Sequence, residues 1–314
     1  MAVKSSGSLS FNTDIVGEFG GSTPHSLSEY YRGGANVPSG VTAVPASGAI
    51  DFSDFYGTSN QVSFTISSNQ KELNLNTYLT GQGWDGSTPV LLTINSGVYI
   101  WSDNTSVAGL TISSAFNGIL TITNNGYIIG RGGNGGGTSS SNGQAGGAAI
   151  SNSATGVTLT NGSGGFIAGG GGGGANGGGP ALGGGGGSGG GVGGSSSAGS
   201  GGSGGALGQA GSTGASTGTG TGGAGGNQGG QGGSRSDSNG AASGGGGGRV
   251  VFGSSSAGDN MISEAIGAPD GGGWGAAGGS TTYQGGPQGG AGGAAISGTS
   301  ISVTNNGTIH GSQA

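Results

Sequence analysis

Few side chains in the glycine-rich half of this chain could do chemistry, and the carboxylates are the first to consider. Glycan hydrolysis needs two carboxylates about 5–10 Å apart in a groove. The acidic residues of this half stand singly in loop-like sequence with no repeated spacing: Asp237, Asp259, Glu264 and Asp270. The two histidines, His25 and His310, lie near opposite ends of the chain, so the serines have no evident histidine partner. We therefore expect a protein that is not an enzyme.

The patterns that bind phosphate groups, metals or nucleic acid are also missing from the sequence. No GxxxxGK[ST] motif occurs and no lysine follows Lys71, so the glycine runs do not read as a phosphate-binding loop. Cysteine is absent, and we expect both histidines to be surface residues, so no metal or cofactor is predicted. The chain has six lysines and arginines in total and a net charge of −6. We therefore expect no basic patch that could bind nucleic acid or an anionic membrane.

Apolar and aromatic side chains interrupt the glycine-rich sequence, and their chemistry is that of binding. Flexible glycine/serine linkers are usually monotonous and lack such side chains. A few aromatic or apolar anchors typically dominate a binding surface. We therefore expect anchors at Phe252, Met261, Ile262, Trp274 and Tyr283, with Arg235 and Asp237 as polar contacts. The alternative is that these side chains only cover the flanks of the glycine-rich fold, the structural role that we expect of Arg249 and Pro180.

Glycine dominates the sequence from residue 131 onward, within a chain of 314 residues that contains 90 glycines. Unbroken runs occur at Gly169–Gly174, Gly183–Gly187 and Gly244–Gly248, which neither helices nor ordinary strands tolerate. Polyproline-II geometry has three residues per turn and leaves the backbone groups free to bond outward. Such helices can pack side by side where side chains are absent. In a bundle of such helices, a helix surrounded by neighbours on all sides needs glycine at every position. A helix on the rim of the bundle needs glycine only on the face that packs against its neighbours. The alternative is a flexible tether.

The sequence before the glycine-rich part divides into two regions. Residues 1–57 contain serines before short apolar patterns and glycines after them, which predicts a small attachment region of short helical turns. Residues 58–130 carry alternating segments such as Val62–Ile66, which predict a β-rich domain, sandwich-like or the start of a β-solenoid. Within it, Trp84-Asp85-Gly86 is typical of a turn with a buried indole.

A repeated pattern of strand, Asn-Gly turn and second strand is the most specific feature of the chain. It occurs at Ile119–Gly130, Val157–Gly169 and Ile301–Gly311, and the sequence AGGAAIS occurs at both Ala145–Ser151 and Ala291–Ser297. Each copy could be a hairpin or a solenoid corner. We predict a mostly β and irregular fold. In it, residues 131–314 form a bundle of polyglycine-II helices clamped by repeated short β-hairpins, with a closing repeat at 294–311.

Several of these segments resemble bacteriophage tail-fibre and tail-tip adhesins. The segments SLSEYYRGG and SGAIDFSDFYG resemble the N-terminal part of phage tail proteins, and GWDGSTPVLLTINSGVYI and LTITNNGYIIGRGGNGG resemble segments that precede their glycine-rich tips. The glycine-rich part is similar in kind to the distal adhesins of T-even-like phages. The resemblance implies layered polyglycine-II helices whose turns at the far end touch a receptor on the bacterial surface.

The expected function is therefore that of a phage tail receptor-binding protein. Its expected partners are an outer-membrane protein or lipopolysaccharide and, through the N-terminal region, other tail proteins. The alternative is a purely structural tail component with a flexible glycine spacer. Ice binding is disfavoured because the threonines at Thr213–Thr221 are few and irregular. The N-terminus has no apolar signal core, and no run of about 20 apolar residues occurs, so we expect synthesis in the host cytoplasm, assembly into the virion tail and no membrane insertion.

Overall fold

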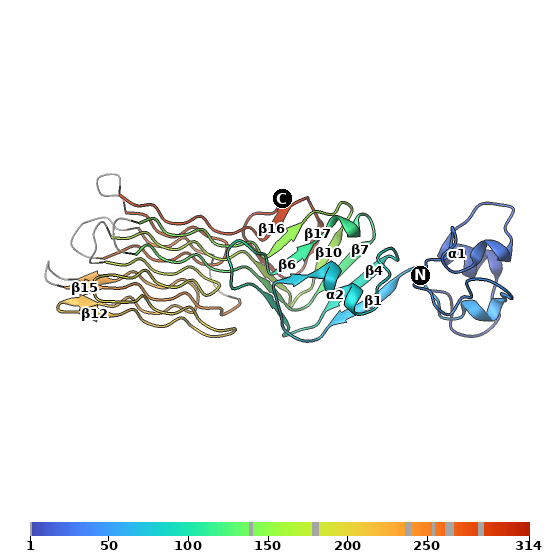
Figure 1. Ribbon diagram of the computed structural model, residues 1–314, viewed down its shortest axis with the longest axis horizontal. Coiled ribbons are helices and arrows are strands. Elements are labelled where there is room, and N and C mark those ends of the chain that lie inside the picture. Colours follow the sequence, from blue (N-terminus) through green and yellow to red (C-terminus); the bar gives the residue numbers. More distant parts are fainter. Residues whose placement is uncertain are drawn as a thin grey trace.

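Three parts follow one another along the long axis of the molecule (Figure 1). A compact N-terminal unit is followed by a middle part of parallel strands and then by a long bundle of extended segments. The computed structural model describes residues 2–137, 141–177, 182–235, 240–252, 255–260, 267–281 and 286–314. The helices within these residues are short, and none is long and apolar enough to cross a membrane.

Short helical turns build the N-terminal unit around an aromatic core. They are η1 (Phe11–Ile15), α1 (Val16–Phe19), η2 (Leu27–Tyr30) and η3 (Phe52–Phe55). The Ser10 hydroxyl accepts the Thr13 N–H and so caps the first of these turns, as the start signals in the sequence predicted. The rings of Phe19 and Tyr30 each meet Phe55 edge to face, with centroids 6.0 and 6.4 Å apart. This packing gives the small unit its own core.

The middle part is a three-sided parallel β-solenoid, called the solenoid below. Its first sheet has the order β1 (Val62–Ile66), β4 (Val90–Ile94), β7 (Leu120–Asn124), β10 (Thr158–Asn161), β17 (Ser302–Asn305). The second has β2 (Gln70–Lys71), β5 (Tyr99–Trp101), β8 (Tyr127–Ile129), β11 (Phe166–Ala168), β18 (Thr308–His310). The third has β3 (Leu73–Asn74), β6 (Leu110–Ile112), β9 (Ile150–Asn152), β16 (Ile296–Gly298). The short helices α2 (Leu75–Gly81) and η4 (Ser114–Phe116) join its turns.

The repeats found in the sequence are corners of this solenoid, and the prediction of hairpins is wrong. The two strands of each repeat lie in different sheets, and each pairs in parallel with its counterpart in another repeat. The corner asparagines stack: Asn161 accepts from the Asn124 amide at 2.8 Å and donates to Asn305 at 2.9 Å. The buried amides of Asn124 and Asn161 find these partners only when the repeats stack, which a sequence of strand and turn does not reveal. The predicted turn at Trp84 is confirmed, because its buried indole donates to the Thr88 carbonyl at 2.8 Å.

The glycine-rich segments are insertions between the second and third faces of the solenoid. Residues 130–149 connect β8 to β9, and residues 169–295 connect β11 to β16. Strands within 150–168 and 296–310 therefore complete the sheets that begin in 58–130. The fold thus divides differently from the boundary expected at residue 130. Both glycine insertions begin and end on the same solenoid, which anchors them (Figure 1).

Backbone hydrogen bonds tie the inserted segments into one bundle, called the glycine bundle below. Within segment 169–177, successive N–H groups donate to three neighbouring segments in turn, and each neighbour recurs after three residues. Gly170 and Gly173 donate to segment 141–149, Gly171 and Gly174 to 182–189, and Gly172 and Ala175 to 276–281. Backbone groups here bond between segments, and each segment therefore depends on its neighbours for its hydrogen bonds.

The unbroken glycine runs occupy the enclosed positions of this bundle, as the sequence predicted. Segments 169–177, 182–189 and 240–249 each donate to three neighbouring segments and accept from three others. A methyl group on Gly171 would lie 2.1 Å from the Gly272 oxygen, and one on Gly185 would lie 1.8 Å from the Gly230 oxygen. Segments on the rim carry a side chain at every third residue, for example Arg131 and Asn134. Only the direction that faces solvent has room for a side chain.

Candidate functional site

The end of the glycine bundle far from the solenoid brings together residues that are distant in sequence. The Asn176 N–H donates to the Ser141 carbonyl at 3.0 Å, and the Thr281 hydroxyl donates to the Asn176 carbonyl at 2.6 Å. Isolated bridges join Leu182 to Ala242 and Ser234 to Gly267. Short antiparallel strands also lie at this end: β12 (Ser216–Thr217), β13 (Gly220–Thr221), β14 (Ser234–Arg235) and β15 (Ala241–Ala242) (Figure 1). This surface is called the distal end below.

Buried side chains make the distal end a fixed platform. Leu182, Ala242 and Ala268 form a small apolar cluster. The fully buried Asn176 amide donates to the carbonyls of Gly137 and Leu182, the second at 2.7 Å. These two acceptors border residues 138–140 and 178–181, which lie outside the described ranges. The segments that lead into the distal turns are therefore held in place by their own side chains and backbone.

The binding anchors expected from the sequence fall into two groups. Arg235 ends β14 at the distal end. Asp237, Met261, Ile262 and Tyr283 lie outside the residues that the structure describes, as do Glu264 and Pro180. The segments bordering these positions end at the distal end, as the Ser234–Gly267 bridge and the Thr281 hydrogen bond show.

Phe252 and Trp274 lie at the opposite end of the bundle, where its turns pack on the second sheet of the solenoid. Trp274 is fully buried, its ring meets Phe166 edge to face at 5.6 Å, and its indole donates to the Val250 carbonyl at 3.1 Å. Phe252 is 56% exposed and meets Tyr127 and Phe166 edge to face, at 5.6 Å each. Its φ of +62° is unusual for a residue other than glycine. In this structure Trp274 packs inside the protein and is closed to a partner.

A stacked arginine also holds the base of the bundle to the solenoid. The Arg249 guanidinium lies over the Trp101 ring, 4.8 Å from its centroid, and donates to the Gly205 carbonyl at 2.6 Å. Burial lowers the pKa of Arg249 to about 10, with a further lowering from Arg131 and an opposing effect of Asp103. The side chain stays charged at neutral pH, and its contacts agree with the structural role expected of it.

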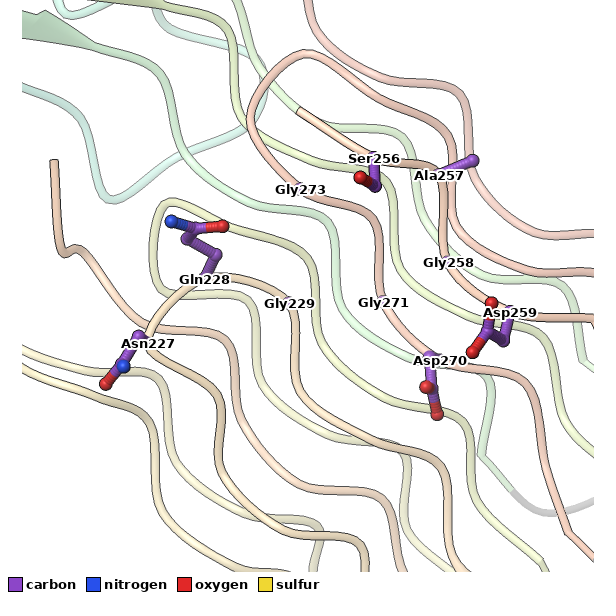
Figure 2. Close-up of a pocket in the computed structure, with 10 residues that line it drawn as sticks. All are labelled: Asn227, Gln228, Gly229, Ser256, Ala257, Gly258, Asp259, Asp270, Gly271 and Gly273. Atoms are coloured by element: carbon purple, nitrogen blue, oxygen red, sulfur yellow. The ribbon is translucent and has the colours of Figure 1, made fainter. Parts of the chain in front are cut away.

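Two carboxylates that looked unrelated in the sequence line one groove on the side of the bundle. Asp259 and Asp270 lie close together, and the Asp259 carbonyl accepts the Asp270 N–H at 3.1 Å (Figure 2). Burial, and then the charge of Asp259, raise the pKa of Asp270, and a hydrogen bond from the Gly232 N–H opposes them. Sequence spacing gave no signal for this pair, because the two segments meet only through the bundle. Among the described residues, no group of three or more His, Cys, Asp or Glu side chains is placed to hold a metal ion.

The comparisons with known proteins define the class of this solenoid-and-bundle protein. A sequence model of the family described as phage tail fibre adhesin Gp38 matches residues 61–314. The chain therefore belongs to the phage tail fibre adhesin Gp38 family, and it is a receptor-binding protein of a virion tail. The resemblance to phage adhesins found in the sequence is thereby confirmed. No curated protein matches the chain.

A solved structure shares the fold. The chain is similar to one in the "Crystal structure of the gp37-gp38 adhesin tip complex of the bacteriophage S16 long tail fiber", with a TM-score of 0.50. The two chains are 22% identical, and the match covers 83% of this chain and 86% of that chain. The likeness therefore extends over most of both chains.

Proposed function

We propose that the distal end of the glycine bundle recognises a receptor on the bacterial surface, and that the bundle consists of polyglycine-II helices. The recurrence of each neighbour after three residues supports this helix type, since polyproline-II geometry has three residues per turn. The observation that carries the proposal is the buried platform around Asn176, where several described segments of the bundle end together. Rigid scaffolds that present variable loops are a common solution for binding.

The candidate contacts are Arg235, which ends β14 at the distal end, and four residues outside the described ranges whose described neighbours in sequence lie at that end: Asp237, Met261, Ile262 and Tyr283. Phe252 and Trp274 lie at the other end of the bundle, so we assign them to its attachment. A flexible glycine spacer, the alternative function, does not account for the hydrogen bonds that join the segments. The proposed activity is binding of an outer-membrane protein or lipopolysaccharide without catalysis.

The N-terminal unit is proposed to dock onto another tail protein. It lies at the end of the molecule opposite the distal end (Figure 1). Large apolar side chains remain exposed on this side, namely Phe52, Tyr56 and Leu91. Tyr56 and Leu91 line one cavity of about 580 Å³ between the unit and the solenoid. Exposed apolar surface of this kind is typical of protein interfaces. The solved relative is itself a complex of two tail proteins.

Competition for host cells tests the receptor-binding proposal. The purified chain should block adsorption of its phage, and replacing 261–266 or 282–285 by Gly/Ser sequence of equal length should abolish the block without changing the melting temperature. Phe252→Ala, at the other end of the bundle, is the matched control and should still block. If the distal replacements keep the block and Phe252→Ala loses it, the proposed location is wrong. Host strains that lack outer-membrane porins or carry truncated lipopolysaccharide separate the two receptor classes.

A further inference from the structure

A polar groove runs along the side of the glycine bundle, away from the distal end (Figure 2). Its volume is about 450 Å³. Segment 267–273 forms its floor, with the turn at 227–229 on one side and segment 255–260 on the other. The residues that line it are Asn227, Gln228, Gly229, Ser256, Ala257, Gly258, Asp259, Asp270, Gly271 and Gly273. None of them is aromatic or basic.

The groove lies where the floor segment lacks a neighbour. Segment 267–273 bonds with 228–235, 182–189, 169–177, 276–281 and 255–260, whereas each enclosed segment bonds with three donor and three acceptor neighbours. Segments 228–235 and 255–260 border the open direction. Within the described part of the chain, no N–H donates to the Gly271 carbonyl, and the Gly229 N–H has no acceptor. One acceptor and one donor of the backbone are thus left for an additional strand.

The Asp270 side chain already makes one of the hydrogen bonds that the missing neighbour would make. In segment 228–235 the N–H groups of Gly230, Gln231 and Gly233 donate to carbonyls of adjacent segments. The Gly232 N–H faces the open direction, and it donates to the Asp270 carboxylate at 2.8 Å. The carboxylate thus supplies the oxygen that a strand would otherwise provide. The Asp270 and Asp259 carboxylates place negative charge beside the groove, and no basic residue is among those that line it.

We propose that this groove binds an extended segment of a partner protein, rich in small residues and carrying a lysine or arginine. The segment takes the open place beside 267–273, donates a backbone N–H to the Gly271 carbonyl and accepts the Gly229 N–H. Its basic side chain reaches Asp259 and Asp270. Sheet edges bind added strands through the same kind of backbone pairing. The unpaired backbone groups favour a peptide over a sugar, as does the lack of an aromatic side chain for stacking. This site is separate from the proposed receptor surface and does not depend on it.

The test measures binding of a fluorescent peptide, end-blocked (Gly-Gly-Lys)₃, to the full chain by anisotropy. We expect saturable binding that Gln228→Trp weakens by about tenfold or more, because the indole fills the groove. Val192→Trp, on an exposed position of segment 191–195, is the matched control and should bind as the wild type does. Asp259→Asn should weaken binding by about fivefold, and (Gly-Gly-Glu)₃ should not bind.

A peptide with N-methylglycine at each glycine tests the backbone pairing, because it keeps the lysines and loses most of the N–H donors. It should bind at least about tenfold more weakly. Equal affinity for wild type and Gln228→Trp, or no binding by the lysine peptide, would overturn the proposal. Binding of calcium ions or neutral methyl glycosides in the groove, without the peptide, would overturn it as well.

Discussion

The centre of the glycine bundle has no room for even a methyl group on the α-carbon. In the enclosed segments the space beside each α-carbon is filled by a carbonyl of the next segment, as at Gly171 and Gly244. Positions at the ends of segments are more open, since a methyl group on Gly137 would have its nearest neighbour at 3.6 Å. The need for glycine therefore follows from the packing around each position and varies along the chain.

Gly171→Ala should destabilise the protein strongly, whereas Gly137→Ala should not. The added methyl group at residue 171 would lie 2.1 and 2.4 Å from two carbonyl oxygens, so segments must separate. We expect Gly171→Ala to lower the free energy of unfolding by about 3 kcal/mol or more, which is the upper end of the range for overpacked cores. Thermal unfolding of both variants measures it. Equal melting temperatures for the two would show that the segments are not in contact as described.

At the scale of elements, corners and turns hold the bundle to the solenoid. The chain leaves the second sheet after Ile129 and again after Ala168, so both insertions start side by side, because β8 and β11 are paired strands. The bundle's turns then fold back onto the outer face of the same sheet. Leu207, Val251 and Trp274 meet the aromatic side chains of β5, β8 and β11 there. This contact fixes the base of the bundle.

Trp274→Ala should loosen the base of the bundle. The fully buried indole fills the contact with Phe166, and its loss should cost about 3–5 kcal/mol, as for other buried tryptophans. Phe252 also meets Phe166 but is 56% exposed, so Phe252→Ala should change the melting temperature far less. Circular dichroism melts of the two variants give the comparison. A Trp274→Ala protein with unchanged stability and lost adsorption would instead make Trp274 a receptor contact.

At the scale of the whole molecule, the proposed receptor surface at the distal end and the proposed docking surface on the N-terminal unit lie at opposite ends of a long body (Figure 1). The solenoid joins the N-terminal unit by polar contacts: Ser39 donates to the Asp85 carboxylate, and the Gly40 N–H donates to Thr88 at 3.1 Å. Burial would raise the pKa of Asp85, and hydrogen bonds from Ser39, Thr88 and Ser87 outweigh it and hold the pKa low. This junction therefore keeps its charge-assisted bonds over the physiological pH range.

Backbone amide exchange across the bundle tests its rigidity as a body. The amides of Gly170–Gly174 are buried and donate to neighbouring segments, so they should exchange slowly, and the exposed residues Ser195 and Ser197 of the distal turn should exchange faster. Mass spectrometry of the deuterated protein resolves the two regions. Uniformly fast exchange over both would support the flexible spacer and remove the basis of the receptor-binding platform.

The sequence alone determined the local features of this protein. Its unbroken glycine runs marked the enclosed segments, because no other residue fits there. Serines before apolar residues marked helical turns in the N-terminal unit, and three repeats marked the coils that frame the insertions. The regular spacing of side chains on rim segments, such as Gln228, Gln231 and Ser234, was also present in the sequence as a signal of three residues per turn.

Only the tertiary structure decided how these features combine. A strand, an Asn-Gly turn and a second strand fit a hairpin and a solenoid corner equally well. The parallel pairing that distinguishes them joins residues as far apart as Asn161 and Asn305. The position of Trp274 at the base, and the meeting of Asp259 with Asp270 in one groove, follow from the order in which segments pack side by side. Glycine backbones offer the same hydrogen-bonding groups to every neighbour, so that order depends on the anchored ends of the segments and not on local sequence.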